Sequence, residues 1–303
     1  MEGFSVDFKE RDFFHLDLGK AVPLIENALS EDRTFNDITS LITIPSDQVG
    51  KGIFKFKSSG ILCGIEIAKL TFKRCSNEIE FTALCFDGDA IDDGEVVAEI
   101  QGPLRFMLSA ERVALNFMQR LSGIASLTYQ YVKEAALGGN SQIVDTRKTT
   151  PGLREFERYA VRCGGAKNHR DTLSDGILIK DNHIASAAAR GISITDLISV
   201  VQKKRPHTLK IEIEVDTPEQ AIEAVSAGAD IILLDNMPPQ MMTDIITNSP
   251  QNIIFEASGG VNLSTVKSIA GTGAHLISVG ALTHSAPAPV SYTHLTLPTN
   301  REV

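Results

Sequence analysis

The sequence is poor in positive charge and in cysteine, and it contains no long apolar run. Its 303 residues include 29 lysines and arginines against 38 aspartates and glutamates, which gives a formal charge of −9 with the histidines taken as neutral. A nucleic-acid or membrane-surface binder needs an excess of cations over a broad face, so this balance argues against both classes. With 43% hydrophobic and 22% charged residues, the chain has the composition of an ordinary globular protein of about two domains.

Cysteine and histidine occur without the spacing that metal sites require. The four cysteines, at positions 63, 75, 85 and 163, form no Cys-x-x-Cys pair, and the seven histidines include no His-x-x-x-His pair. We therefore predict neither a zinc site nor a disulfide framework, and we interpret the cysteines as reduced core residues. No stretch approaches the roughly 18 apolar residues of a membrane span, and the N-terminal segment mixes charged and apolar side chains, which predicts a cytoplasmic protein.

The C-terminal half alternates short apolar segments with helical segments, which is typical of parallel βα units. We predict strands at 142–145, 176–179, 209–215, 231–234, 253–255 and 276–279. The predicted helices lie at 153–163, 186–204, 217–227, 238–247 and 262–270. This order of elements predicts an α/β barrel or a doubly wound sheet.

The N-terminal half has a different pattern, which predicts an α+β domain. Its predicted helices lie at 18–29, 66–74 and 110–136, and its predicted strands at 52–57, 61–63, 79–85 and 95–100. Leu115, Met118, Leu121 and Ile124 recur at helical spacing, which indicates a core-facing side. The glycines of the segment 137–140 suggest a linker, so we predict one domain over 1–139 and a second over 140–287.

Charged and small residues follow the predicted strands of the C-terminal half. In chain order these ends carry Asp145 with Arg147 and Lys148, then Lys180, Glu214, Asp235, Glu256 with Ser258-Gly259-Gly260, and Gly280. In a parallel βα barrel these positions meet on one rim, where the active sites of such folds are built. We therefore expect them to face a single pocket.

Positive charge is concentrated in one segment of this acidic chain. From Arg147 to Lys180 there are eight cations and four acids, a balance of +4, against −13 for the remaining residues. A solvated helix face is one interpretation of such a segment. The other is one wall of a pocket for a polyanion, because arginine forks match carboxylates and lysine binds phosphate as a point charge.

Glu214 and Asp235 end neighbouring predicted strands on the same rim. Beside so many cations they can bind a ribose diol, hold a magnesium ion with its waters, or stabilise an oxocarbenium-like centre. Alternatively, they only neutralise Lys180 and Arg170. The small residues after the last two strands favour a phosphate site made of main-chain N–H groups, whereas we interpret His183 and His275 as structural.

Several motifs of the chain resemble those of the quinolinate phosphoribosyltransferase family. They are Glu111-Arg-Val-Ala-Leu-Asn116, Asp145-Thr-Arg-Lys-Thr-Thr-Pro-Gly-Leu-Arg154, Cys163-Gly-Gly-Ala-Lys-Asn-His-Arg170, Leu178-Ile-Lys-Asp-Asn-His183, Ile213-Glu-Val-Asp216, Leu233-Leu-Asp-Asn236 and Glu256-Ala-Ser-Gly-Gly260. They occur in order over about residues 15 to 287. The resemblance implies an open, incomplete α/β barrel with an N-terminal α+β sandwich domain, assembled as a homodimer or a larger homo-oligomer.

The resemblance also implies the reaction. Quinolinate and phosphoribosyl pyrophosphate would give nicotinate mononucleotide, pyrophosphate and carbon dioxide, with Mg²⁺ and without an organic cofactor. This is a step of NAD biosynthesis. The substrates fit the charge pattern, since quinolinate carries two carboxylates and the other substrate carries a phosphate and a pyrophosphate.

Site residues carry over from the family position by position. Arg147, His169 and Arg170 match quinolinate-binding positions, with Thr146 beside them, and Arg112 matches an arginine that enters the site of the neighbouring subunit. Lys148 and Lys180 match lysines that contact the phosphoribosyl substrate or bridge the two ligands. Glu214 and Asp235 match carboxylates on the side of the ribose and the magnesium, which they would hold through water. Ser258, Gly259, Gly260, Val279, Gly280 and Ala281 match the loops around the 5′-phosphate.

The segment 288–303 departs from the family pattern, which usually closes with a short acidic and apolar strand. We predict that roughly Val290 onward is foreign to the native gene, against the alternative of a genuine divergent tail. An ordered tail packed into the barrel or the sandwich would count against a foreign origin.

Two other functions remain open at this point. Lys180 at a strand end occupies the kind of position used by Schiff-base lyases. A non-catalytic homologue that binds a pyridine or phosphoribosyl ligand is the second alternative.

Overall fold

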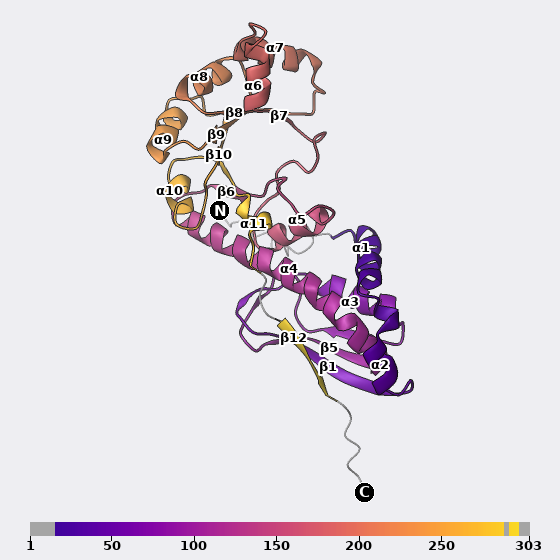
Figure 1. Ribbon diagram of the computed structural model, residues 1–303. Coiled ribbons are helices and arrows are strands. Elements are labelled where there is room, and N and C mark those ends of the chain that lie inside the picture. The colour runs from indigo at the N-terminus through magenta and orange to yellow at the C-terminus, as the bar shows by residue number, and fades with distance from the viewer. Residues whose placement is uncertain (1–15, 288–290, 297–303) are drawn as a thin grey trace, which may run out of the picture. The chain divides into compact units, whose positions relative to one another are not determined.

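The computed structural model describes residues 16–287 and the main chain of residues 291–296. The chain packs into two compact units: 1–127, 150–165 and 286–303 form the first, and 128–149 and 166–285 form the second. Each unit contains one main sheet, antiparallel in the first and parallel in the second (Figure 1). Each unit combines segments that are far apart in the chain, so the units do not correspond to two consecutive stretches of sequence. The domain boundary between 139 and 140 therefore stays a prediction.

The second unit contains a six-stranded parallel sheet. Its strands are β6 (Gln142–Val144), β7 (Ile177–Ile179), β8 (Ile211–Val215), β9 (Ile231–Asp235), β10 (Ile254–Ser258) and β11 (Leu276–Ser278), in the order β6-β11-β10-β9-β8-β7. The first and last strands of this order are β6 and β7, which are not paired with each other. The predicted open, incomplete α/β barrel is therefore confirmed.

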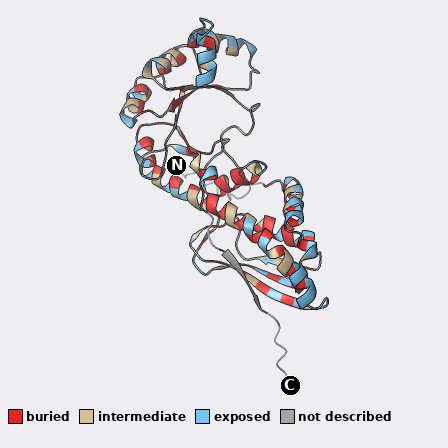
Figure 2. Ribbon diagram, viewed as in Figure 1, coloured by how far each residue is buried: buried red, intermediate tan, exposed pale blue. Residues whose placement is uncertain are grey.

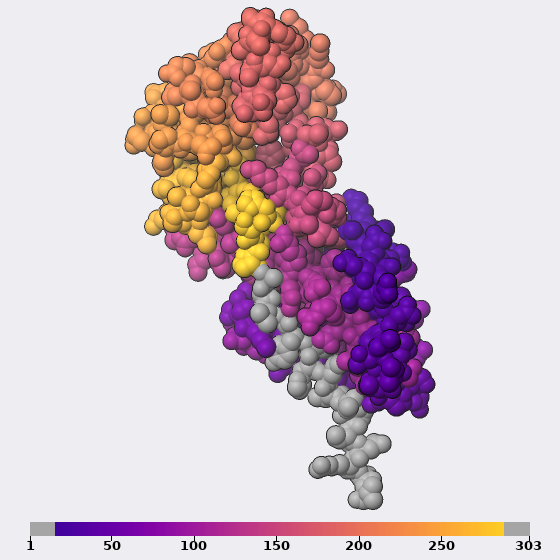
Figure 3. Space-filling model, viewed as in Figure 1, coloured from indigo at the N-terminus to yellow at the C-terminus, as the bar shows by residue number. Residues whose placement is uncertain are grey.

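Helices follow the strands around the outside of this sheet. They are α6 (Asp181–Ala188), α7 (Ile194–Lys204), α8 (Pro218–Ser226), α9 (Pro239–Thr247), α10 (Val266–Ala270) and α11 (Ala281–His284). Figures 1 and 3 show α7 to α10 in chain order, coloured from red to yellow. The helix predicted over 186–204 is wrong as one element, because Gly191 at φ +72° separates α6 from α7. Strand β9 is apolar up to its last residue, as a buried parallel strand requires, whereas β8 carries Glu212 and Glu214 on one face and apolar residues on the other.

The first unit consists of an antiparallel sheet and helices. Its elements are α1 (Leu18–Glu31), η2 (Thr34–Asn36), α2 (Ile38–Thr43), β1 (Val49–Phe56), β2 (Gly60–Ile61), α3 (Ile65–Cys75), β3 (Glu80–Ala83), β4 (Ala90–Ile91), β5 (Val96–Pro103), the 104–127 part of α4 (Leu104–Ala136), α5 (Arg154–Cys163) and β12 (Ser291–Thr296). Phe54, Phe72 and Phe81 form an aromatic cluster between β1, α3 and β3. The core-facing side predicted for α4 is confirmed, since Leu115, Met118, Leu121 and Ile124 are buried (Figure 2).

Helix α5 belongs to the first unit although it follows β6 in the chain. The Glu157 carboxylate is fully buried and accepts hydrogen bonds from Arg120 Nη2 at 2.6 Å and from the Thr150 main-chain N–H at 3.0 Å. The Tyr159 hydroxyl donates to Asp87 Oδ2 at 2.8 Å. These paired buried groups fix α5 against α4 and the loop before β4, because a buried charge is stable only when it is paired.

Strand β12 lies at the edge of the antiparallel sheet, next to β1, in the order β12-β1-β5-β3. Its register pairs Lys51 with Thr296 and Phe56 with Ser291. This is the ordered arrangement that counts against a foreign tail. Pairing at a sheet edge uses main-chain groups that almost any sequence supplies, so the origin of the tail stays a prediction. Residues 288–290 and 297–303 of the tail lie outside the described chain.

Candidate active site

The ends of the parallel strands surround a cavity of about 540 Å³ in the second unit. Its lining combines cations, carboxylates and small residues: Thr146, Arg147, Lys148, His169, Arg170, Leu178, Lys180, Glu214, Leu233, Asp235, Asn236, Glu256, Ser258, Gly259, Gly260 and Ser278. We call it the rim cavity. The residues come from every strand of the sheet or from the segments that follow the strands, as expected for the carboxyl ends of parallel strands.

Eleven of the fifteen predicted site residues line the rim cavity. Val279, Gly280 and Ala281 follow β11 but are not part of the lining; Val279 is 1% exposed, and Gly280 lies beside the stem of Lys148. Arg112 lies on α4, in the first unit, and is exposed. The geometry adds Leu178, Leu233, Asn236, Glu256 and Ser278, which the candidate set lacked.

One wall of the rim cavity carries positive charge. Arg147, Lys148, Arg170 and Lys180 all line it, and the buried Nε of Arg147 has no hydrogen-bond partner in the described chain. Arg170 Nη1 donates to Gly176 O at 2.8 Å. Burial, and then the neighbouring charge of Arg147, lower the pKa of Arg170. Arginines gathered against their mutual repulsion favour an anionic ligand, and a buried unpaired N–H needs an acceptor.

The charge-rich segment does not act as a whole. Arg154, Arg158 and Arg162 lie on α5 in the first unit, and Lys167 does not line the rim cavity. The interpretation of the entire segment as one wall of the pocket is therefore wrong for these four cations. The amphipathic helix α5 interrupts the segment, and its cations are placed by packing within the first unit.

The two rim carboxylates have different neighbours. Lys180 Nζ lies 2.8 Å from Glu214 Oε2, and Asp235 Oδ2 accepts a hydrogen bond from Asn236 Nδ2 at 2.7 Å. Glu214 thus neutralises Lys180, as one of the sequence interpretations had it. Each of these contacts uses one oxygen of its carboxylate. Carboxylate oxygens that line a cavity suit Mg²⁺ held through water. The donor chemistry of Glu214 and Asp235 therefore fits the predicted ion.

The turn after β10 approaches the turn after β9 closely. Gly259 has φ +87°, and a Cβ there would lie 2.3 Å from Asn236 Oδ1. Asn236 has φ +53°, and its N–H donates to Ser258 O at 2.9 Å. Glycine is required at position 259, since any side chain would collide with Asn236. The result is a cavity wall of main-chain groups, which an anionic oxygen can approach.

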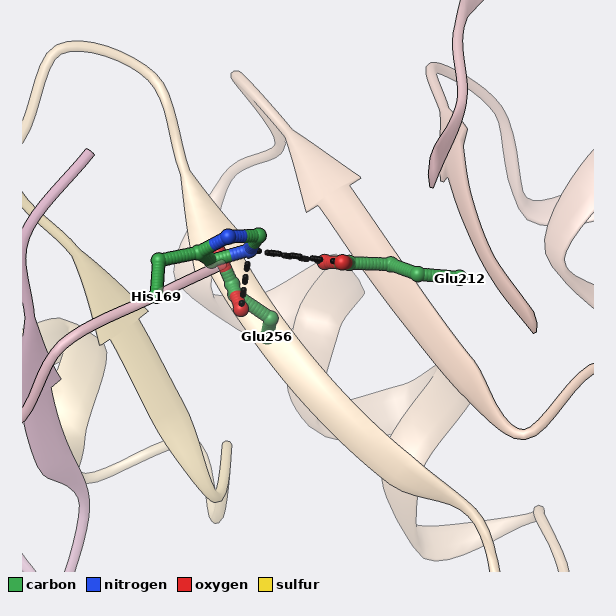
Figure 4. A group of neighbouring side chains, drawn as sticks. All are labelled: His169, Glu212 and Glu256. Carbon is green, nitrogen blue, oxygen red and sulfur yellow. Dashed lines mark hydrogen bonds and ion pairs between the residues drawn. The ribbon is translucent and has the colours of Figure 1, made fainter. Parts of the chain in front are cut away.

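His169 extends across the barrel interior to Glu212, which sequence reasoning did not select, and to Glu256, which it placed at a strand end without a role of its own (Figure 4). Its Nε2 lies 3.3 Å from Glu212 Oε2 and 3.5 Å from Glu256 Oε2. The exposed fractions of the three side chains are 14%, 8% and 1%. The sequence Ile211-Glu-Ile-Glu-Val215 could have identified Glu212 as a site residue. Alternate residues of a strand share a face, so Glu212 points the same way as the selected Glu214.

The protons of this group are shared. Burial, followed by repulsion from Glu212, raises the pKa of Glu256 to about 7. Burial lowers the pKa of His169, but the hydrogen bond to Glu212 and the charges of Glu256, Glu212 and Asp145 outweigh it, so that the pKa is raised overall. The three ligand atoms lie within 4.8 Å of one another, close enough to hold a cation. A proton on His169 Nε2 that is shared with the two carboxylates explains the same short distances without a metal ion.

A second cavity, of about 550 Å³, reaches the same group from another side. It shares His169, Arg170 and Glu256 with the rim cavity, and Glu212 lines only this second one. These shared side chains therefore separate two hollows of the open barrel.

The two other histidines of interest have structural roles. His275 Nδ1 accepts from the Phe255 N–H at 3.1 Å, and its ring stacks on that of Phe255. His183 is exposed rather than packed, and its Nδ1 accepts from the Lys180 N–H at 2.9 Å at the start of α6.

Comparison with known proteins gives a consistent result over nearly the whole chain. Residues 37–122 match the family model "Quinolinate phosphoribosyl transferase, N-terminal domain", and residues 124–289 match that for the C-terminal domain. A protein of Bacillus subtilis named "Probable nicotinate-nucleotide pyrophosphorylase [carboxylating]" is 43% identical over 89% of this chain and 91% of its own length.

Solved structures agree. The crystal structure of NadC from Streptococcus pyogenes has a TM-score of 0.87 at 36% identity and covers 93% of this chain and 99% of its own. The nicotinate-nucleotide pyrophosphorylase of Francisella tularensis has a TM-score of 0.86 at 32% identity, over 92% and 96% of the two chains. In the described part of the chain, no helix is long and apolar enough to cross a membrane.

The raised pKa of Glu256 predicts a pH-dependent stability. Between the ordinary glutamate pKa and about 7 the folded chain keeps a proton that the unfolded chain releases, so the free energy of unfolding falls as the pH rises through this window. His169, whose pKa is also raised, contributes with the same sign. The wild-type free energy of unfolding should fall between pH 5 and pH 8. In Glu256→Gln this fall should be smaller by on the order of 2 kcal/mol, measured by denaturant unfolding. Exposed Glu219→Gln is the control, and equal slopes in wild type and Glu256→Gln would contradict the assignment.

Proposed function

This chain belongs to the quinolinate phosphoribosyl transferase family, and on that premise we infer that the rim cavity is its active site. The enzyme transfers the phosphoribosyl group of phosphoribosyl pyrophosphate to quinolinate. It releases pyrophosphate and carbon dioxide and leaves nicotinate mononucleotide, a precursor of NAD. The observation that carries the assignment of the site is the gathering of Arg147, Arg170, Lys148 and Lys180 in one cavity with Glu214 and Asp235.

Quinolinate binds at the arginine side of the cavity. Arg147 and Arg170 receive its two carboxylates, since a guanidinium presents a planar fork that matches a carboxylate. The partnerless Nε of Arg147 supports this role, because a ligand oxygen would satisfy it. Thr146 and His169 line the same cavity and are the neighbours of these arginines in the chain.

The phosphoribosyl substrate occupies the remainder of the cavity. Lys148 and Lys180 face its pyrophosphate as point charges. The main-chain groups of Ser258, Gly259 and Gly260 form the nearer part of the 5′-phosphate site. The turn of Val279, Gly280 and Ala281 beside Lys148 forms the other part.

Glu214 and Asp235 are the residues that would hold Mg²⁺, through water. When bound, the ion supplies charge neutralisation for the leaving pyrophosphate. The same two carboxylates stabilise the positive charge that develops on the ribose as the bond from the anomeric carbon to the pyrophosphate oxygen breaks. Lys180, held at 2.8 Å by Glu214, stays a cation on the pyrophosphate side.

Bond formation and decarboxylation then take place on the quinolinate ring. The quinolinate ring nitrogen forms the new bond to the anomeric carbon and becomes a pyridinium. Loss of the adjacent carboxylate as carbon dioxide leaves its electron pair on the ring carbon, where the pyridinium charge stabilises it, and a proton then replaces the carboxylate. An organic cofactor is not needed for this decarboxylation.

The Schiff-base alternative for Lys180 is not favoured. A lysine that attacks a carbonyl must lose its proton, usually through desolvation or a neighbouring cation. Lys180 is instead half-exposed, and its Nζ lies 2.8 Å from the Glu214 carboxylate, so the described chain supplies neither the desolvation nor the adjoining cation that would activate it. A non-catalytic homologue is not favoured either, because the rim cavity contains the arginines, lysines and carboxylates together.

The reaction is tested directly with purified protein, Mg²⁺, quinolinate and phosphoribosyl pyrophosphate. We expect nicotinate mononucleotide and carbon dioxide in equal amounts, and little product when nicotinate replaces quinolinate, since one carboxylate contact is lost. A preparation that binds both substrates yet forms no product from quinolinate would contradict the proposal.

Arg147→Ala and Arg170→Ala should each weaken quinolinate binding. Removal of a charge-assisted hydrogen-bonding pair costs about 1.5–3 kcal/mol, so the quinolinate KM should rise by roughly 10- to 100-fold. The KM of phosphoribosyl pyrophosphate should change much less. Arg190→Ala is the matched control, because Arg190 is exposed and its Nε donates to Ser186 O, away from the rim cavity. An unchanged quinolinate KM in both rim variants would refute their role.

The assembly is proposed to be a homodimer or larger homo-oligomer, with Arg112 of each subunit entering the site of its neighbour. Arg112 on α4 is exposed, which supports this proposal. Arg112→Ala should then lower activity and leave the subunit fold unchanged by circular dichroism. Mixing Arg112→Ala and Lys148→Ala chains should restore activity at one of the two sites, about half of that expected for two intact sites, whereas failure to complement would contradict a shared site. A cytoplasmic location stays a prediction from the sequence.

A further inference from the structure

Both ring nitrogens of His169 are engaged inside the protein. Nδ1 accepts a hydrogen bond from the main-chain N–H of Arg170 at 2.8 Å. Nε2 faces Glu212 at 3.3 Å and Glu256 at 3.5 Å, so the ring proton lies on Nε2 and is donated to carboxylates. The lone pair of Nδ1 is used by the Arg170 N–H. The ring therefore offers the rim cavity its carbon edge and no free nitrogen lone pair.

The main chain before His169 is fixed as firmly as its ring. Asp145, which is fully buried after β6, accepts hydrogen bonds from the His169 N–H at 2.7 Å and from Asn168 Nδ2 at 2.6 Å. Lys167 forms a parallel bridge with Val144 of β6. The segment that carries Arg170 is thereby tied to β6 on one side, and through the imidazole to β8 and β10 on the other.

Arg170 needs such support because of where it lies. Its guanidinium is partly buried and close enough to Arg147 for the two charges to disfavour each other. In the absence of a ligand, repulsion favours a backbone shift that separates them. A hydrogen bond at the N–H of Arg170 itself opposes that shift, and one to Gly176 O holds the guanidinium.

We propose that Glu212 and Glu256 act as positioning residues for quinolinate: they hold His169, and His169 holds the main chain of Arg170, so that Arg147 and Arg170 stay side by side. His169 then contributes to quinolinate affinity through Arg170 rather than by a polar contact of its own. This inference rests on the proposed function and deepens it.

A double-mutant cycle on the quinolinate KM separates the two roles of His169. If His169 acts through Arg170, His169→Ala should raise the KM about tenfold in the wild-type background and change it by less than about twofold in the Arg170→Ala background. A direct contact between His169 and quinolinate would multiply the two effects. In the wild-type background His169→Asn should raise the quinolinate KM less than His169→Ala does, since an amide oxygen can still accept the hydrogen bond from the Arg170 N–H. Independent, multiplicative effects would overturn the proposal.

Glu212 gives a second and more distant test. It does not line the rim cavity, and it reaches the quinolinate side through the groups it acts on: His169, which it holds by a hydrogen bond, and Arg170, which its charge stabilises. Glu212→Leu should raise the quinolinate KM about tenfold, with kcat and the KM of phosphoribosyl pyrophosphate changed by less than about threefold, because buried charged hydrogen bonds contribute at this level. Exposed Glu219→Leu on α8 is the same substitution without the contact. Near-native thermal unfolding of Glu212→Leu would show that its KM is that of a folded chain.

The outcomes distinguish this inference from the function on which it rests. Absence of turnover in the wild-type enzyme would contradict the proposed function before any variant is compared. An active wild type with an unchanged quinolinate KM in Glu212→Leu, or with a multiplicative cycle, would contradict only the positioning roles.

Discussion

Repulsion between like charges is the constraint on which the site depends. Arg147 and Arg170 face one cavity of the second unit, where burial and the charge of Arg147 lower the pKa of Arg170. Such a pair persists only when the surrounding structure fixes both backbones and a ligand anion completes the balance. The parallel sheet fixes the backbones, because strand ends cannot move without breaking the hydrogen bonds between strands. The two substrates, which carry many negative charges, supply the anions.

The carboxylates of the barrel that balance this positive charge lie in two layers, one at the rim and one buried below it. At the rim, Glu214 and Asp235 are partly exposed and line the cavity, where they can meet a metal ion and a developing cation. One layer deeper, Glu212 and Glu256 are buried and bind a protein group, His169. Their difference in role follows from the pleat of the strands, which places alternate residues on one face and sets each layer at a different depth.

How far sequence reasoning reached differs between elements. The six parallel strands were predicted within a few residues, because each is a short apolar run bounded by turn residues, and their ends then identified most of the rim. The helix predicted over 186–204 was wrong because a single glycine breaks it. Glu212 was missed because a glutamate inside an apolar strand shows no sign of the partner it meets across the barrel. The cations of α5 were assigned to the pocket because charge along a chain does not tell which unit a helix packs against.

The sequence by itself determined the parallel α/β architecture, the family and the set of charged residues at the strand ends, since all three follow from local patterns and motifs. Only the tertiary structure decided which cations face the cavity, and that His169 binds two buried glutamates instead of presenting a free nitrogen. The physical reason is that these properties depend on distances between residues far apart in the chain. Burial and the positions of neighbouring charges then set each group's protonation, and neither is encoded in any one segment.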